Sequence, residues 1–494
     1  MTISPSPSRR PFLASNAFVA VVLFTLTLSV AAFSVQQRRP LGDVARLTDE
    51  WYVLGLNLAT VGTLGLEDEP ILLRPPGYPF FIAAALRLVA GKPQALNWGY
   101  WERGLHAVYL AQAFVLAATA AVLYLWQARF LRRSVAVTAA LAFGLNPYSV
   151  VLTGLLHYDV LHLFFLVSGG WALGSAFAAT APVRSWPWLR AGLVLGLATL
   201  VRPVTLLLPA LVLLALWARR GSSRRSALRP AALFAAGLVI VVAPWTVRNY
   251  AVSGRVIPVN DQAWAAIWGS TTKPLGIHPN HYKWASLRTE LSQVFLRVSG
   301  RSDFDYVAYV RSGEAYEAAF REEALRNLRR SPGVYLQNAV SGLLAYGLHI
   351  NSVFIKAFQY KQTAGVPAET SWFVIGHPQD FYPGGASTTF SAYAFLMTAL
   401  AGGGIVVACK GRDSRALGPG MVFACLALAH AISYMDLMYY YQRLPFLFMF
   451  SSFLVEWSQD RELRLPRLGW RIPLGPVLLA AVASGILLTP IVLA

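Results

Sequence analysis

Long apolar runs recur along the chain and are separated by short polar segments. Each is about 18–22 residues long, enough to cross roughly 30 Å of hydrocarbon as a helix. The segments expected to cross are 17–35, 104–126, 135–152, 157–177, two short helices within 188–217, a helix from Pro230, 390–409, 416–434, 439–457 and 472–493. The pattern predicts an all-α polytopic membrane protein with about 11 transmembrane helices.

Two shorter apolar segments are not expected to cross. Segment 78–90 is about 13 residues long and follows the proline-rich sequence RPPGYP, which excludes a continuous helix through it. We expect juxtamembrane helices here, in the first loop. Segment 335–350 is predicted to be a membrane-surface helix, because a crossing would move the basic loop at Lys410 and Arg415 to the wrong side.

The polar segments divide the chain into three parts. Residues 1–250 are predicted to form an N-terminal transmembrane catalytic module that includes a first extracytoplasmic loop, 36–103. Residues 251–333 are the longest polar stretch and are expected to form an extracytoplasmic insert. Residues 334–494 return to transmembrane helices. We see no period of about 20–50 residues that would indicate a repeat architecture.

Composition and charge support a membrane location. Hydrophobic residues make up 56% of the chain and charged residues 13%, with a mean hydropathy of +0.49 and a formal net charge of +19. The arginines gather in short clusters between apolar runs, above all in 219–229, as cytoplasmic loops do. The charge therefore indicates topology, with a cytoplasmic N-terminus, and does not favour nucleic acid as a partner.

Acidic residues concentrate just after the first predicted helix. Segment 47–81 holds Asp49, Glu50, Glu67, Asp68 and Glu69, five of the chain's 23 acids. Ionisable groups beside a membrane segment are costly unless they line water or a cavity, so this stretch is a candidate functional site.

On the predicted topology, several polar side chains gather at the extracytoplasmic face. They are Asp49, Glu50, Arg74, Tyr78, Tyr158, Asp159, Arg202, Arg248, Asn249 and Arg443. Carboxylates suit a general base, and arginines suit an anionic partner that they hold through paired hydrogen bonds.

Structural explanations for these residues stay open from the sequence. Asp49 and Glu50 also fit a solvated loop or a helix cap. Asp159 also fits a cap, or a partner of His157 or His162. The arginines also fit anchors whose charged ends reach the interface. The histidines show no metal-ligand spacing and no nucleotide-binding glycine motif is present, so neither a metal site nor a nucleotide-driven pump is predicted.

Five motifs resemble, in the same order, those of bacterial C-type (GT-C fold) integral-membrane glycosyltransferases. That group includes the protein O-mannosyltransferases and the 4-amino-4-deoxy-arabinose lipid A transferases. The motifs are Asp49-Glu50 with Tyr52, RPPGYP from Arg74, LVRP ending at Pro203, PWTVRNY ending at Tyr250, and QRLP from Gln442. The run Tyr439-Tyr440-Tyr441-Gln442-Arg443 departs from the family's Arg-Tyr-Arg pattern.

The resemblance implies transfer of a hexose or pentose from a polyprenyl-phosphate donor to a lipid, protein or glycan acceptor, with inversion. It implies a bacterial plasma (inner) membrane and an extracytoplasmic active face. Asp49-Glu50 matches the catalytic acidic pair, with Asp49 the first choice of base, and Asp159 matches a second acid. The resemblance makes Arg74, Tyr78, Arg202, Arg248 and Arg443 candidates for the lipid phosphate and sugar ring. A divalent cation is compatible with this chemistry, but the sequence shows no obligatory site.

Two rival interpretations belong to other classes. A multi-pass transporter or lipid flippase would use Asp159 and the arginines as substrate or proton sites near the middle of the bilayer. It predicts repeated halves, which we do not find. A catalytically silent assembly partner would keep the fold without the chemistry.

Overall fold

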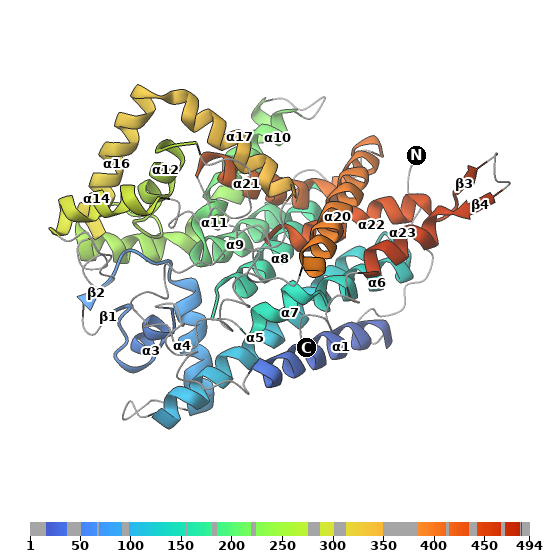
Figure 1. Cartoon of the computed structure of the whole chain (residues 1–494), viewed down its shortest axis with the longest axis horizontal. Helices are drawn as coiled ribbons and strands as arrows, with labels where there is room; N and C mark the ends of the chain where they lie inside the picture. The colour runs from blue at the N-terminus through green and yellow to red at the C-terminus, as the bar shows by residue number, and fades with distance from the viewer. Residues whose placement is uncertain are drawn as a thin grey trace.

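The computed structural model describes residues 16–36, 51–66, 69–90, 98–154, 156–179, 185–218, 224–274, 287–300, 313–348, 384–411, 414–433, 442–465, 470–484 and 486. These residues are overwhelmingly helical, with two short antiparallel hairpins near opposite ends of the long axis (Figure 1). The expected fold class, an all-α membrane protein, is confirmed.

The N-terminal half supplies most of the central bundle. Its helices are α1 (Asn16–Gln36), α5 (Trp98–Gln127), α6 (Arg133–Gly144), α7 (Pro147–Thr153), α8 (Asp159–Ala178), α9 (Ser185–Val201), η2 (Pro203–Leu207), α10 (Leu208–Ala218) and α11 (Arg224–Ser253). Their apolar side chains pack into one large core together with the C-terminal helices.

Four segments of the described chain are long and apolar enough to cross a membrane. They are Arg103–Gln127, Asp159–Ala178, Ala227–Ser253 and Ser414–Ile432. Eight shorter apolar helices accompany them, α1, α4, α6, α9 and α22 among them. The larger number of crossings expected from the sequence stays a prediction.

The first loop contains the two helices expected there. It comprises α3 (Trp51–Thr60), the hairpin of β1 (Gly65–Leu66) and β2 (Glu69–Pro70), and α4 (Gly77–Ala90). Gly55 lets α3 approach α4 closely, since a β-carbon there would lie 2.4 Å from the side chain of Ile82. Tyr52, Leu56 and Ile82 are buried together between the two helices.

The chain breaks at Arg202-Pro203, as the sequence predicts. Arg202 has an extended backbone, with φ −155° and ψ 124°, because the following proline ring disfavours helical geometry at this position. Helix α9 ends at Val201, and the short η2 leads into α10. The break leaves the Arg202 side chain at the junction of two helices.

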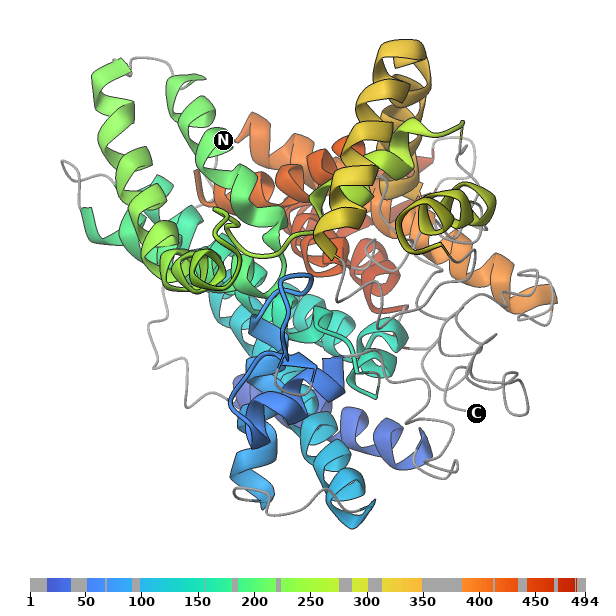
Figure 2. The same ribbon diagram turned by 90° about the vertical axis from the view of Figure 1, so that its left-hand side faces the viewer.

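The insert consists of helices that share a hydrophobic core with the first loop. It comprises α12 (Ala263–Thr271), α14 (Arg288–Ser299) and α16 (Gly313–Arg330), which Figure 2 views from their end of the molecule. Trp268 and Phe320 of the insert pack in one buried cluster with Leu54, Leu64 and Ile71 of the first loop. Each part therefore covers apolar surface of the other.

The C-terminal part continues the bundle. Its elements are α17 (Pro332–Leu348), α20 (Gly384–Lys410), η4 (Ser414–Ala416), α21 (Leu417–Ile432), α22 (Leu444–Ser458), β3 (Glu462–Leu465), β4 (Trp470–Pro473) and α23 (Leu474–Ala483). Strands β3 and β4 pair antiparallel, with Glu462 opposite Pro473.

Helix α17, the predicted surface helix, packs against α21. The Tyr335 hydroxyl donates a 2.9 Å hydrogen bond to the Ile432 carbonyl at the end of α21. Further along α17, Tyr346 packs on Phe423, with ring centroids 5.5 Å apart. These contacts run antiparallel along α21, a predicted span, so α17 lies lengthwise against it. The position of α17 relative to the membrane stays a prediction.

The two ends of the bundle differ in their polar groups. One end, called here the Asp159 end, holds Asp159 at the start of α8. At the Arg132 end, Arg132 Nη2 lies 2.8 Å from Asp460 Oδ2. The hydrogen bond to Asp460 raises the pKa of Arg132 above its ordinary value. The carbonyl of Arg415 lies against Gly174 near the other end of α8. The sequence's basic clusters at 129–133 and 410–415 thus share this end.

Helices α9 and α11 approach so closely that their crossing requires glycine. A β-carbon at Gly192 would lie 2.0 Å from the Phe234 carbonyl oxygen, and one at Gly237 would lie 2.3 Å from the Leu189 carbonyl oxygen. Small residues allow such approach in membrane bundles. Gly192→Ala is therefore expected to destabilise the protein by about 1–3 kcal/mol. Thermal unfolding in detergent tests this, with Gly402→Ala, which meets no neighbour, as the control. Equal effects of the two changes would contradict the packing argument.

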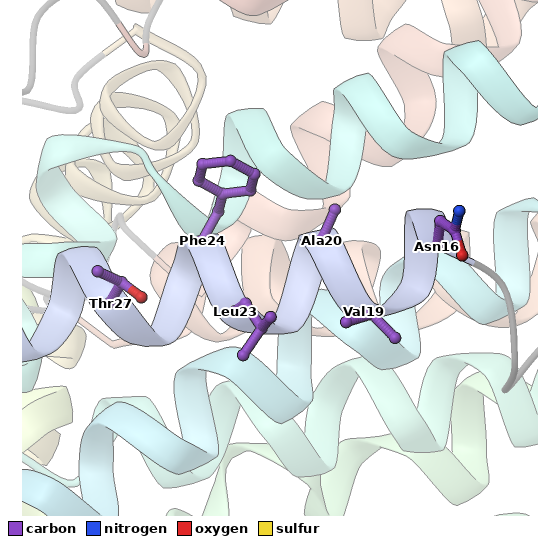
Figure 3. Close-up of a pocket in the computed structure, with 6 residues that line it drawn as sticks. All are labelled: Asn16, Val19, Ala20, Leu23, Phe24 and Thr27. Atoms are coloured by element: carbon purple, nitrogen blue, oxygen red, sulfur yellow. The ribbon is translucent and has the colours of Figure 1, made fainter.

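A shallow groove of about 440 Å³ follows one face of α1 (Figure 3). Its lining residues are Asn16, Val19, Ala20, Leu23, Phe24 and Thr27. None of them is charged, and Leu23 and Phe24 are exposed. Such a surface suits contact with acyl chains and offers nothing for catalysis.

Candidate active site

Asp159 is the centre of a buried polar cluster at the start of α8. Its side chain is fully buried. His157 Nδ1 lies 2.7 Å from Asp159 Oδ2, and Gln442 Nε2 donates a 2.5 Å hydrogen bond to Asp159 Oδ1. Arg202 Nη1 lies 3.8 Å from the same Oδ1. The Asp159 carboxylate therefore contacts side chains from three segments, which lie around positions 157, 202 and 442.

Local chain geometry brings these groups to one depth. Asp159 is the first residue of α8, and His157 lies two residues before it. Arg202 lies in the break between α9 and η2. Gln442 and Arg443 immediately precede α22. Each of these side chains thus lies at a helix end. A polar side chain there does not replace an apolar one within the packed face of a helix.

Arg443 extends the cluster toward α17 and α21. Its side chain is only 1% exposed, and its guanidinium carbon lies 5.5 Å from the centroid of the Tyr346 ring. The His430 ring packs on the same tyrosine, with centroids 4.5 Å apart. Among the described residues, the cluster thus combines two buried guanidinium groups with one buried carboxylate.

An aromatic wall adjoins the cluster. The Trp51 ring lies 5.1 Å from that of Tyr158 and 6.0 Å from that of Tyr78, centroid to centroid. The Tyr78 hydroxyl donates a 2.7 Å hydrogen bond to Gln112. Arg202 lies 5.8 Å from the centroid of Tyr158, on the side of Asp159. Arg74 covers Trp51 at 5.3 Å.

Three predicted binding residues hold protein groups. Arg248 donates hydrogen bonds to the carbonyls of Ile71 and Leu64, at 2.9 and 3.2 Å. Asn249 donates to the carbonyls of Ile257 and Val259, both at 3.0 Å. Arg74 donates to Gln262 at 3.3 Å. Arg248 joins the first loop to α11, and Asn249 holds the chain that follows α11, whereas their roles in substrate binding stay predictions.

The acidic pair Asp49 and Glu50 lies outside the described residues, as do Tyr439–Tyr441. Trp51, the next residue after the pair, is described and buried against Tyr158. Tyr158 in turn precedes Asp159 in the chain. The first loop therefore reaches the Asp159 cluster immediately after the acidic pair.

Comparisons with known proteins add a structural similarity. The sequence matches no family model and no curated protein. The chain is similar to an oligosaccharyltransferase, AglB from the archaeon Archaeoglobus fulgidus, in complex with an inhibitory peptide and a dolichol-phosphate. The identity is 14%, the TM-score is 0.47, and the match covers 97% of this chain and 56% of that one. The apo form of the Archaeoglobus fulgidus enzyme gives a TM-score of 0.48 at 14% identity, covering 98% of this chain and 56% of that one.

A third similar structure is ArnT from Cupriavidus metallidurans bound to undecaprenyl phosphate. It is 14% identical, with a TM-score of 0.38, over 96% of this chain and 88% of that one. The chain thus spans little more than half the length of the oligosaccharyltransferase chains and most of the third. At these identities and TM-scores, the similarity by itself assigns neither family nor activity.

The structure places residues in the Asp159 cluster that were not predicted as site residues from the sequence. His157 entered the sequence argument only as an alternative partner of Asp159, and Gln442 only as part of a motif. Both contact the Asp159 carboxylate. Tyr346 and His430 carried no signal, because each stands alone in an apolar run. The sequence signal that could have identified His157 is its position two residues before Asp159, at the start of a predicted helix.

Proposed function

We propose that this protein is a glycosyltransferase that moves a sugar from a polyprenyl-phosphate donor to an acceptor outside the cytoplasm. The observation that carries the proposal is the buried Asp159 cluster, with Arg202 and Arg443 at one depth of an apolar bundle. Buried guanidinium groups beside a lipid-facing surface suit an anion that arrives attached to a lipid. The motifs that resemble GT-C enzymes contribute these same residues.

The reaction that fits is one displacement with inversion at the anomeric carbon. The acceptor oxygen forms a bond to that carbon while the bond to the phosphate oxygen breaks. The electron pair leaves with the polyprenyl phosphate, whose negative charge Arg202 and Arg443 stabilise. Asp49 and Glu50 are the carboxylates proposed to act on the acceptor, and Asp159 is proposed to hold the site's polar side chains in place. Tyr78 and Tyr158 supply an aromatic wall for the sugar, and Arg74 borders it.

The membrane sidedness follows from charge. The Arg132 end gathers the basic clusters that mark cytoplasmic loops, together with Arg415. The Asp159 end then faces away from the cytoplasm, where nucleotide sugars are absent. A donor carried in the membrane, as in a bacterial plasma membrane, satisfies this constraint.

The test uses purified protein and undecaprenyl-phosphate-linked sugars, with release of undecaprenyl phosphate as the readout. Asp49→Asn is expected to lower turnover by about 10²- to 10⁴-fold, the cost of removing a carboxylate that acts on the acceptor. Asp460→Asn changes an exposed carboxylate at the Arg132 end and is the matched control. Solute uptake into liposomes by wild type without donor cleavage would instead establish a transporter.

A further inference from the structure

The position of Asp159 limits what this carboxylate can do. Its side chain is fully buried, and its oxygens face His157, Gln442 and Arg202. A carboxylate enclosed in this way positions its neighbours and does not itself reach an acceptor. His157 differs, because its side chain keeps some exposure, 7%.

We propose that His157 is the group that takes the proton from the acceptor, and that Asp159 orients it. This role rests on the proposed glycosyl transfer and assigns the proton acceptor within it. The ring places Nδ1 2.7 Å from Asp159 Oδ2. At that distance the carboxylate can neutralise an imidazolium, and Nε2 lies on the other side of the ring from Asp159.

The choice of an imidazole over a carboxylate has a chemical reason. General base catalysis works best when the pKa of the base lies near the working pH. An ordinary imidazole titrates at about 6.5, whereas ordinary carboxyl groups titrate at about 4. The pairing of an imidazole with a buried carboxylate is also the arrangement that activates the base in Ser-His-Asp enzymes.

Charged and titratable groups surround the pair on several elements. Tyr158 stacks on His157, with ring centroids 4.3 Å apart. His162 lies one turn further along α8, within reach of the charges of Asp159 and Arg202. Arg202 comes from the end of α9, and Arg443 from the start of α22. Asp159 stabilises the imidazolium that forms during the step.

Proton transfer to His157 accompanies the displacement at the anomeric carbon. The acceptor O–H bond breaks, its proton goes to His157 Nε2, and its oxygen forms the bond to the anomeric carbon. The bond from that carbon to the phosphate oxygen breaks, and polyprenyl phosphate leaves with the electron pair. The imidazolium stays paired with Asp159 until water removes the proton. Asp49 and Glu50 then bind the acceptor.

The experiment compares wild type, His157→Gln, His157→Asn and His162→Gln for donor cleavage between about pH 5 and 9. His157→Asn keeps an N–H donor near the position of Nδ1, which preserves the contact with Asp159 while removing the base. We expect wild-type turnover to fall at acid pH, because a protonated imidazole cannot take the acceptor's proton. Both His157 variants are expected to lose about 10²- to 10⁴-fold in kcat and to lose that acid limb, with KM for the donor little changed. His162→Gln is expected to keep the limb.

Four outcomes would overturn this role. An acid limb that persists in both His157 variants but disappears in Asp49→Asn would make Asp49 the base. Wild-type kcat in His157→Asn would reduce His157 to a structural contact. A divalent-cation requirement that disappears in the His157 variants would assign His157 to a metal site. Wild type that cleaves no donor would overturn the proposed function as well, which separates that failure from the other three.

Discussion

Replacing Asp159 by asparagine is expected to lower donor turnover by about 10²- to 10⁴-fold. The carboxylate faces donors from His157, Gln442 and Arg202. An asparagine keeps one acceptor oxygen and turns an NH₂ group toward these donors. The His157 ring then loses the negative charge that pairs with its imidazolium.

The same position is expected to be critical for stability. Asp159→Ala removes the negative partner of a buried cationic cluster, which costs about 3–5 kcal/mol when one member of a buried pair is lost. Thermal unfolding in detergent measures the loss, alongside donor turnover. Asp460→Asn is the control, because Asp460 is 83% exposed and pairs with Arg132 at the Arg132 end. Wild-type turnover in Asp159→Asn would refute its place in the site.

Arg443→Met is expected to weaken binding of undecaprenyl phosphate by about 30-fold or more, the effect of removing one buried charge from a charge pair. Arg443 is almost completely buried, so its charge is screened little by water. A methionine side chain is similar in length to that of arginine and carries no charge that burial would destabilise. The melting temperature of Arg443→Met is therefore expected to equal or exceed that of wild type. Loss of binding without loss of stability separates a ligand role from a structural one.

Binding of undecaprenyl phosphate in detergent, followed by calorimetric titration, measures this effect. The matched control is Arg461→Met, because Arg461 follows the other end of α22, away from the Asp159 cluster. Its guanidinium carbon lies 4.0 Å from the centroid of the Trp457 ring, so it too contacts an aromatic side chain. Arg461→Met is expected to bind as wild type does. Equal affinity in Arg443→Met and wild type would show that the buried guanidinium serves packing against Tyr346 and not the phosphate.

The shared core of the first loop and the insert bears on how the site is built. Trp268 and Phe320 pack against Leu54 and Ile71, and Arg248 ties the same loop to α11. The loop that carries the acidic pair is therefore supported from outside the bundle. The described helices of the insert thus support the first loop through a shared core.

The sequence by itself determined the parts of the fold that depend on short-range chemistry. Apolar runs specify helices because a helix satisfies its own backbone hydrogen bonds in hydrocarbon. The break at Arg202 follows from the proline after it. The choice of Asp159 followed from the cost of an acid in an apolar helix, and the structure indeed surrounds it with partners. These inferences need only neighbours along the chain.

Only the tertiary structure decided which of the polar residues meet. Arg202 and Arg248 look alike in the sequence, each near a helix end beside proline or tryptophan, yet one faces Asp159 and the other binds backbone carbonyls. Helix α17 lies along α21 because of packing that no charge pattern encodes. Gln442 reaches Asp159 across 283 positions of sequence. Partners so distant in the chain are chosen by how the helices pack, and a linear pattern of residue types does not contain that information.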